Sequence, residues 1–413
     1  MKFRWTLILA AAILALSSCL GDLVPFDNSG PSKKAEREGM PGLHFDKMMI
    51  LYSEGYNNLQ GSLDKNINEL CEGYIPPKWG NDAIVVFSHA SVNSSDWATD
   101  TEPVVFRIYE QYGEVVRDTV FRYPAESVSV EKEFMKKVLG DIKDRYPSDS
   151  YGMVYTSHGT GWIPKDYKKT SETFSAKPMG IGAEFDGTYP SYTYIQLDID
   201  EFREAIPFHM DYIVMDACLM GGVEVVYEWR DICDYLAASP GEVLTVGFDY
   251  YKLSERLLKG DEPDLVGICT DYYEMNAIDR NQDGRQDGDA TIALYDCSKI
   301  EALAQACVPI FEAHRSALAT IKTSQVQSFN YTYKYHFDFR DILVKLGATP
   351  SELVPVDAAL DELVLYKNAT EDFLGNHIST YSGLSMFLPV SSWPKLNDCY
   401  KSTSWNQATG FVK

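Results

Sequence analysis

A histidine and a cysteine each follow a short apolar segment of this 413-residue chain. His158 comes directly after residues 152–157, and Cys218 comes directly after residues 212–216. A nucleophilic cysteine needs a base or a cation beside it, because the thiolate is the reactive form, and histidine is suited to that role. Gly159 follows the histidine and has no Cβ to keep a substrate backbone away. The pattern therefore indicates nucleophilic catalysis by a thiol.

Each of these residues also has a plain structural interpretation. A free cysteine behaves as a small hydrophobic residue and is common in buried strand ends, and a histidine before a glycine can simply mark a turn. Taken singly, each residue favours the structural interpretation. The two together, at the ends of strands in one predicted sheet, favour the catalytic one.

The elements that must position this pair alternate between apolar runs and amphipathic stretches, which is typical of an α/β protein. Strands are predicted over residues 48–52, 83–88, 104–109, 114–121, 152–157, 212–216, 235–238, 292–296 and 384–388. Helices are predicted over residues 59–71, 130–145, 198–206, 223–233, 299–321, 339–346 and 356–365. Because ligands of open α/β sheets lie beyond the carboxyl ends of the strands, His158 and Cys218 should meet at that edge.

The residues around the histidine and the cysteine resemble the signatures of a known peptidase family. Residues 157–162 read Ser-His-Gly-Thr-Gly-Trp, and residues 216–220 read Asp-Ala-Cys-Leu-Met. Both strings are similar to the catalytic motifs of the clostripain-like cysteine peptidases. Residues 49–58 and 383–386 also resemble family landmarks, so the resemblance covers roughly residues 47–388.

The resemblance implies a fold and a mechanism. The fold is a caspase-like three-layer αβα sandwich with a mostly parallel central sheet, followed by a helical C-terminal accessory region. Cys218 would attack the scissile carbonyl and form a thioester acyl-enzyme, while His158 would protonate the leaving amine and later activate water. The backbone N–H groups of Gly159 and Cys218 would form the oxyanion hole. Catalysis of this kind requires no cofactor, and the sequence nominates no third catalytic residue.

The resemblance also implies cleavage after Arg or Lys, with acidic residues in the specificity pocket. Asp216 stands two residues before Cys218, so that in a strand both side chains point to one face. Its alternative role is to accept hydrogen bonds from nearby backbone N–H groups. Glu242 and Asp249 follow the next predicted strand and are the candidates for a second pocket acid. The sequence around them departs from the family pattern, which leaves a strict preference for Arg open.

Two other classes of function remain open at this level. The first is a catalytically silent surface lipoprotein that binds peptides through the same cleft. The intact His158, Gly159 and Cys218 argue against it, because a retired site usually loses one such residue. The second is another cysteine hydrolase, such as an amidase, on a related α/β scaffold.

An acidic segment before the predicted strand at 292–296 resembles the start of a calcium loop. Acidic and amide side chains alternate and are followed by glycine, as in an EF-hand. The candidate ligands of a structural Ca²⁺ are Asp279, Asn281, Asp283, Asp287 and Asp289. Ala290 stands where the bidentate Glu of a standard loop should be, so a looser calcium loop and a solvated acidic turn are both open.

The first residues predict export and anchoring. Lys2 and Arg4 precede the apolar run 7–16, which has the length of a signal peptide and is too short for a transmembrane helix. Small residues then lead to Cys19, as in a bacterial lipobox, where this cysteine would carry the lipid. The predicted location is the cell envelope, on the membrane through a lipid anchor and facing either the periplasm or the outside.

Composition and charge indicate the domain organisation and the kinds of partner. The expected organisation is a signal peptide over 1–18, a polar lipidated tether over 19–42, a peptidase core over 43–296 and a helical region with a late strand over 297–413. The formal charge of −23 argues against a nucleic-acid partner. The expected partners are the membrane and a peptide or protein substrate with basic residues. The eight cysteines show no compact disulfide framework and no CxxC pair.

Overall fold

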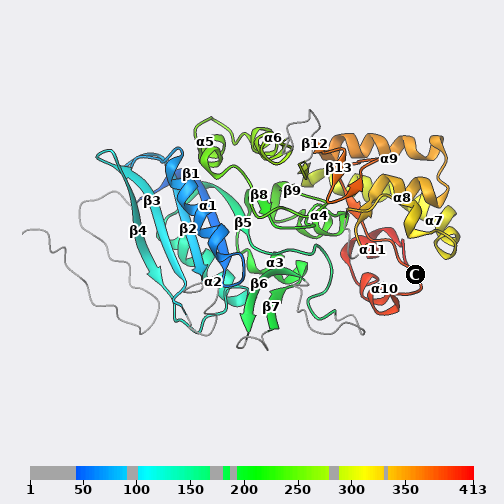
Figure 1. Ribbon diagram of the computed structural model, residues 1–413, viewed down its shortest axis with the longest axis horizontal. Helices are drawn as coiled ribbons and strands as arrows, with labels where there is room; N and C mark the ends of the chain where they lie inside the picture. The colour runs from blue at the N-terminus through cyan, green and yellow to red at the C-terminus, as the bar shows by residue number, and fades with distance from the viewer. Residues whose placement is uncertain (1–42, 91–100, 168–179, 187–192, 279–287, 330–333) are drawn as a thin grey trace, which may run out of the picture. The chain divides into compact units, whose positions relative to one another are not determined.

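The computed structural model describes residues 43–90, 101–167, 180–186, 193–278, 288–329 and 334–413. Residues 43–413 form one compact unit. The main sheet consists of β1 (Phe45–Gly55), β2 (Asp82–Ala90), β3 (Val104–Gln111), β4 (Glu114–Arg122), β5 (Ser148–Thr156), β8 (Met210–Asp216), β9 (Cys233–Ala238), β10 (Thr291–Asp296) and β12 (Val364–Ala369). Its nine strands have the order β12-β10-β9-β8-β5-β1-β2-β3-β4 (Figure 1).

The centre of this sheet is parallel and both of its edges are antiparallel. Strands β2, β1, β5, β8 and β9 run in one direction, whereas β3 with β4 and β10 with β12 form the antiparallel edges. The strands predicted over 104–109 and 114–121 are therefore confirmed, as is the mostly parallel central sheet. Parallel strands need both faces covered, which explains why these strands are nearly continuous apolar runs.

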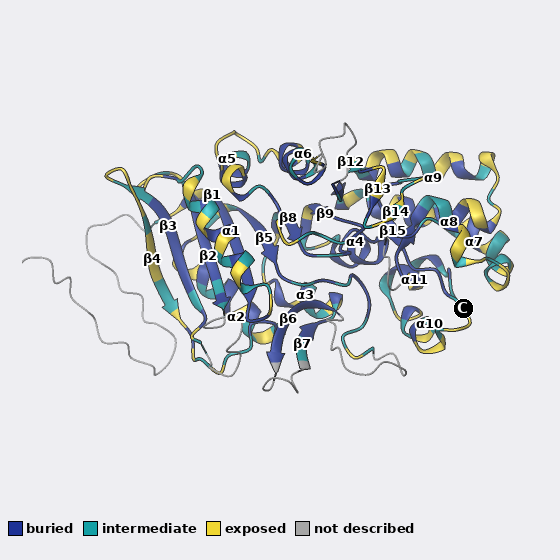
Figure 2. Cartoon of the chain, viewed as in Figure 1, coloured by how far each residue is buried: buried dark blue, intermediate teal, exposed yellow. Residues whose placement is uncertain are grey.

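Helices cover both faces of the sheet. One face carries α1 (Gln60–Glu72), α5 (Tyr250–Leu258) and α6 (Leu265–Asn276); the other carries α2 (Lys132–Arg145), α3 (Ile199–Ala205), α4 (Val223–Trp229) and α7 (Ile300–His314). Side chains of β1 alternate between the two layers: Ile50 and Tyr52 join the core under α2, and Leu51 joins the core under α1. Buried residues accordingly fill the sheet and the inward helix faces (Figure 2). The three-layer αβα sandwich is confirmed.

The region after residue 296 contributes to the sheet as well as to its cover. It contains α8 (Phe339–Leu346), α9 (Pro350–Leu363), α10 (Pro394–Tyr400), α11 (Ser404–Thr409) and the two-residue strands β11 (Phe337–Asp338), β13 (Asp372–Phe373), β14 (Asn376–His377) and β15 (Ser385–Met386). Strand β12 pairs antiparallel with β10. The helix predicted over 356–365 is therefore wrong at its end, because residues 364–369 satisfy the free edge of β10 instead.

One other prediction from the pattern needs correction, and two features of the structure were not predicted. The helix predicted over 299–321 ends at His314 and continues as a 3₁₀ turn over Arg315–Ala319. Helices α5 and α6 were not predicted. The segment between the two candidate motifs contains a small hairpin of β6 (Ile181–Asp186) and β7 (Thr193–Leu197), also not predicted. Among the described residues, no helix has the length and apolarity to cross a membrane.

Candidate active site

The histidine and the cysteine leave neighbouring parallel strands at the same edge of the sheet. Strand β5 pairs with β8 so that Thr156 lies opposite Asp216, and His158 and Cys218 each follow two residues later. The two loops also touch. A Cβ added to Gly159 would lie 2.6 Å from the carbonyl oxygen of Cys218, a contact that only glycine allows. The fold thus brings together the two motifs that the sequence singled out.

The His158 ring has an ordered partner that the sequence did not nominate. Its Nε2 lies 2.7 Å from Oδ1 of Asn58, which follows the end of β1. Because the amide oxygen accepts, the proton of the neutral ring belongs on Nε2 and leaves Nδ1 free to take a proton. Strand β1 lies next to β5 in the sheet, so an Asn beyond its carboxyl end was the available signal.

The Cys218 thiol bonds to the backbone of the segment between β9 and α5. Its Sγ lies 3.2 Å from the N–H of Val243 and 3.5 Å from the carbonyl oxygen of the same residue. Burial raises the pKa of the thiol to about 12, and the charges of Glu242 and Asp216 act in the same direction. The thiol is therefore neutral in this arrangement.

The imidazole is also neutral. Burial lowers the pKa of His158 to about 4. Among the described residues, its ring nitrogens bond only to Asn58, and the thiol of Cys218 bonds only to Val243. The thiol and the imidazole therefore have separate partners and are both neutral in this arrangement.

The chain turns sharply directly after the cysteine. Leu219 has φ of 65°, a left-handed conformation that costs a side chain with a Cβ about 1 kcal/mol or more. Two backbone bonds hold the turn against the segment after β9: Leu219 N–H donates to Gly241 O (2.7 Å), and Gly221 N–H donates to Ser239 O (2.8 Å). The strain is thus maintained by the neighbouring strand end.

The backbone around Gly159 leaves its N–H without an acceptor in the described part of the chain. Thr160 N–H donates to Gly180 O, and Gly182 N–H donates to the carbonyl of His158, both at 2.9 Å. These bonds flank Gly159, which pairs with Ile181 across the β6 strand. The geometry leaves the predicted oxyanion donor available.

The Asp216 carboxylate is buried at the same end of the sheet and faces the segment before α5. It accepts hydrogen bonds from Tyr250 OH (2.7 Å) and from Thr156 Oγ1 (3.2 Å). Its burial raises its pKa to about 6. Gly247 covers it with φ of 66°, and a Cβ there would lie 2.6 Å from Oδ2. Within the described ranges, no Lys or Arg pairs with this carboxylate.

The other two acidic candidates lie near Asp216 in the chain but differ in their surroundings. Asp249 is the N-cap of α5: its side chain accepts the Lys252 N–H at 3.2 Å and also pairs with the Lys252 ammonium at 3.2 Å. Glu242 is half-buried beside Cys218, whose pKa it helps to raise.

Most of the predicted calcium ligands lie outside the described residues, as does Cys19. These ligands are Asp279, Asn281, Asp283 and Asp287. The remaining one, Asp289, is described, and its Oδ1 accepts the N–H of Leu374 at 2.5 Å. Over the described ranges, no group of three or more His, Cys, Asp or Glu side chains is arranged to hold a metal ion.

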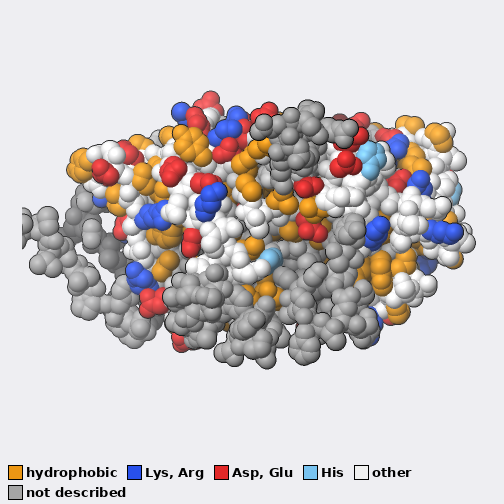
Figure 3. Space-filling model, in the orientation of Figure 1, with side chains coloured by type: hydrophobic (Ala, Val, Ile, Leu, Met, Phe, Trp, Pro, Cys, Tyr) orange, Lys and Arg blue, Asp and Glu red, His pale blue; other side chains and the backbone are white. Residues whose placement is uncertain are grey.

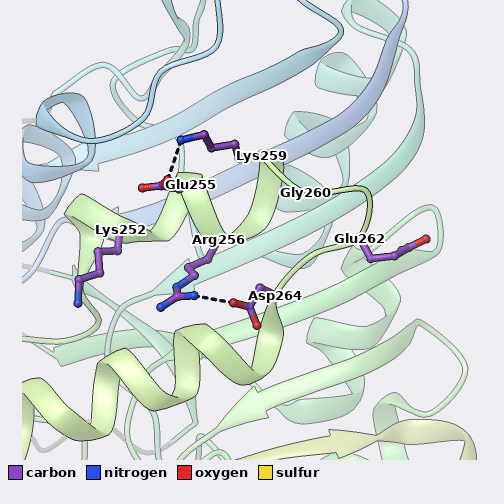
Figure 4. A pocket seen from close by; sticks show the side chains of 7 residues that line it. All are labelled: Lys252, Glu255, Arg256, Lys259, Gly260, Glu262 and Asp264. Atoms are coloured by element: carbon purple, nitrogen blue, oxygen red, sulfur yellow. Dashed lines mark hydrogen bonds and ion pairs between the residues drawn. The ribbon is translucent and has the colours of Figure 1, made fainter.

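A surface hollow of about 530 Å³ lies on α5 and the connection to α6 (Figure 4). Its cations are already paired: Lys259 with Glu255 at 2.8 Å, and Arg256 with Asp264 at 2.7 Å. Because these charged groups already bind one another, the hollow is a weaker candidate for a substrate site than the edge of the sheet that carries His158 and Cys218. On the face drawn in Figure 3, acidic and basic side chains are interspersed, without a continuous basic patch.

Comparison with known proteins agrees with this geometry. A model of the clostripain family (peptidase C11) matches residues 51–409. Clostripain of Hathewaya histolytica is 23% identical over 428 residues, which cover 88% of this chain and 80% of that protein.

Solved structures of related peptidases share the fold. An inactive zymogen of a C11 protease from Parabacteroides distasonis is 25% identical, with a TM-score of 0.73 over 90% of this chain and 99% of that one. A secreted C11 cysteine protease from Bacteroides thetaiotaomicron, in complex with an irreversible peptide inhibitor, is 22% identical, with a TM-score of 0.73 over 88% and 98% of the two chains.

Proposed function

The chain belongs to the clostripain family of cysteine peptidases, and on this basis we propose that it is an exported endopeptidase that cleaves after Arg or Lys. The His158–Cys218 dyad carries the chemistry in this proposal. The observation that supports it best is the contact between Gly159 and the carbonyl of Cys218, because it packs the base-bearing loop against the nucleophile-bearing loop.

The proposed reaction starts with a rearrangement on the cysteine side. Substrate would displace Val243 from the thiol, and Cys218 would then pass its proton to Nδ1 of His158 and attack the scissile carbonyl. The bond between that carbonyl carbon and the leaving nitrogen breaks as His158 returns the proton to the amine. Water, deprotonated by the same imidazole, hydrolyses the thioester. The N–H groups of Gly159 and Cys218 would bind the oxyanion, and loss of one such donor costs about 3 kcal/mol.

Asp216 supports the preference for a basic residue before the cut. It is an ionisable carboxylate that is 6% exposed and bonded to hydroxyl groups. A buried carboxylate without a cation is costly, so a substrate ammonium or guanidinium group would be strongly favoured beside it. Glu242 is the candidate for a second acid because its charge acts on the thiol of Cys218, whereas Asp249 caps α5 and pairs with Lys252.

Export, lipid anchoring at Cys19 and a structural Ca²⁺ complete the proposal. The signal-peptide pattern and the lipobox-like cysteine support the anchor. The alternating acidic and amide side chains at 279–289 support calcium. Replacing Cys19 by Ala should release the protein from the membrane fraction. A chelator should lower the melting temperature if calcium is bound, and an unchanged melting temperature would end the calcium proposal.

The central test compares the purified protein with its Cys218→Ala variant on peptides that differ only in the residue before the cut. Cleavage after Arg or Lys by the wild type alone is the expected result. Cleavage by both proteins would contradict the nucleophile assignment, and cleavage after uncharged residues would contradict the acidic pocket. Hydrolysis of simple amides but not of peptides would favour an amidase. Tight peptide binding without hydrolysis would favour a binding lipoprotein.

A further inference from the structure

Two buried glutamates lie beside the histidine loop, and the proposed chemistry uses neither of them. Glu54 lies in β1 and is 0% exposed, and Glu184 lies in β6 and is 4% exposed. Within the described ranges, no Lys or Arg pairs with either carboxylate. Two like charges without a cation are unfavourable in a protein interior, so one of the two groups should hold a proton.

One oxygen of Glu54 bonds to its own segment and to two others. Its Oε2 accepts hydrogen bonds from the hydroxyl of Ser157, from the backbone N–H of Ala183 at 3.1 Å and from the side-chain amide of Asn57 at 3.3 Å. Asn57 also donates to the carbonyl of Ala183 at 2.7 Å. Glu54 therefore joins the end of β1, the end of β5 and strand β6.

Two of these donors directly precede the residues of the site. Ser157 comes before His158, and Asn57 comes before Asn58. The Nε2 of His158 and the Oδ1 of Asn58 form the 2.7 Å bond that fixes the ring. Because successive Cα atoms are held about 3.8 Å apart, a shift of either donor moves its neighbour. The Glu54 carboxyl group thus sets both ends of the bond that orients the base.

The hydrogen bonds around Ser129 indicate where a proton lies. Its N–H and its hydroxyl both lie 2.6 Å from Oε2 of Glu184. The same hydroxyl lies 3.4 Å from Oε1 of Glu54 and 3.0 Å from Nδ1 of His89. A hydroxyl has one proton to donate. Because the contact with Glu184 is the shorter one, the Ser129 hydroxyl donates to Glu184. A protonated Glu54 would in turn donate to the Ser129 oxygen across the 3.4 Å contact.

We propose that Glu54 and Glu184 hold one proton between them and act as a positioning pair, which sets His158 against Asn58 through Ser157 and Asn57. This inference rests on the dyad of the proposed function. The pair would not touch substrate. Glu184 would carry the charge, and Glu54 would be a neutral acid that both accepts and donates.

Electrostatics agrees with this arrangement. Burial, and then the charge of Glu184, raise the pKa of Glu54 to about 8. The other titratable groups that face the pair are Tyr52 on β1, Tyr155 on β5 and His89 on β2, whose Nδ1 lies 3.6 Å from Glu184 Oε2. Above a pH of about 8 the pair would carry two charges. Their repulsion should then disturb the bond between His158 and Asn58 and lower kcat.

The test uses two substitutions of Glu54 in the otherwise intact protein. Glu54→Ala should lower kcat about 10- to 100-fold with KM changed by less than about twofold, since the pair acts on the base and not on substrate. Glu54→Gln keeps a donor and an acceptor. It should retain kcat within about threefold and lose the fall in activity above a pH of about 8. Asp338→Asn is the matched control, because Asp338 is another buried acid and caps α8; it should leave kcat and the pH profile unchanged.

Two outcomes would overturn the proposal. Full activity in Glu54→Ala would show that the pair does not position the base. An equal loss of kcat in Glu54→Ala and Glu54→Gln would show that a neutral side chain with a donor and an acceptor cannot replace Glu54. Should Glu54→Ala fail to fold, Ser157→Ala removes the hydrogen bond from the histidine loop to Glu54, together with a 3.4 Å contact to Asn57. It should lower kcat about 3- to 10-fold, and an unchanged kcat would also overturn the proposal.

A measurement that does not require peptide cleavage separates this inference from the dyad. The rate of Cys218 alkylation by iodoacetamide can be followed against pH by intact mass. An equal rate in wild type and in His158→Ala would contradict the dyad itself. A rate that depends on His158 but has the same pH profile in Glu54→Gln would contradict the positioning pair alone.

Discussion

The histidine side and the cysteine side of this site are built in opposite ways. His158 is held through Asn58, Ser157 and a buried carboxyl group, in bonds that join β1, β5 and β6. Cys218 bonds only to Val243 among the described residues. Val243 belongs to the irregular segment 239–249, where Val246 is 46% exposed.

The difference suggests two separate tasks in the proposed site: the histidine side fixes the orientation of the base, and the cysteine side sets the protonation of the thiol. Dense buried hydrogen bonding keeps the base in one orientation before substrate arrives, which lowers the cost of reorganisation during reaction. Burial and the charges of Glu242 and Asp216 raise the pKa of the thiol, which is therefore neutral in this arrangement. In the proposed mechanism the base is thus oriented before substrate binds, whereas the thiol changes partner when substrate binds.

The largest expected effect comes from removing the base. His158→Ala should lower kcat/KM about 10³-fold or more, because no other described group is placed to take the thiol proton. The value of kcat/KM is measured by peptide hydrolysis at a near-neutral pH of about 7.5. His209→Ala is the control, since His209 is exposed and pairs with Asp234 at 3.0 Å. If His158→Ala kept a kcat/KM within about tenfold of the wild type, His158 would not be the catalytic base.

The contact between the two sides is the next most sensitive point. Gly159→Ala would place a Cβ 2.6 Å from the carbonyl oxygen of Cys218 and push the loops apart. We expect a loss of about 10²-fold in kcat, comparable to the loss of one oxyanion donor. Gly140→Ala is the matched control, because a Cβ there meets nothing within 4 Å. Equal activity in the two variants would mean that the loops do not work as a unit.

A smaller, substrate-dependent effect is expected for Asp216→Asn. Activity on Arg and Lys peptides should fall about 10- to 100-fold, and activity on uncharged peptides should not. In the wild type, kcat/KM on basic peptides should decrease below a pH of about 6, where Asp216 takes up a proton. The variant should lack that decrease. A wild-type pH profile in the variant would contradict the pocket.

Asp216→Asn also tests stability, with a definite sign. The pKa of about 6 in the folded protein is above the value near 4 of an unfolded Asp. The folded state therefore binds more protons between these values, and this group lowers stability as pH rises through that window. The variant should be more stable than the wild type by about 1–3 kcal/mol at pH 7.5, measured by urea unfolding. A less stable variant would show that the charged form is favoured in the fold.

The smallest effect is expected for Asn58→Ala. The ring of His158 would lose its orienting acceptor but would keep its chemistry, so kcat should fall about tenfold with little change in KM. Asn58→Asp would place a negative charge beside Nε2 and should raise the pKa of the ring. The pH dependence of Cys218 alkylation reports that shift. An unchanged kcat in Asn58→Ala would contradict the role of Asn58 and also the proposal that Glu54 acts through the bond between His158 and Asn58.

The local sequence pattern was sufficient to predict the strands and helices that position His158 and Cys218. The continuous apolar runs of β1, β5 and β8 and the helical spacing of Val138, Leu139 and Ile142 in α2 need no distant partner to be recognised. Residues 364–369 are different. Their assignment depends on the free edge of β10, so the same apolar residues read as the end of a helix until that partner is known.

The sequence by itself identified the peptidase family and placed a thiol and an imidazole beyond the ends of two strands, within motifs that resemble that family. Only the tertiary structure decided their states. Burial lowers the pKa of His158 to about 4, and burial together with the charges of Glu242 and Asp216 raises the pKa of Cys218 to about 12. Asn58, Glu54 and Val243 reach the site from other segments. Such contacts join residues far apart in the chain, and local periodicity carries no information about them.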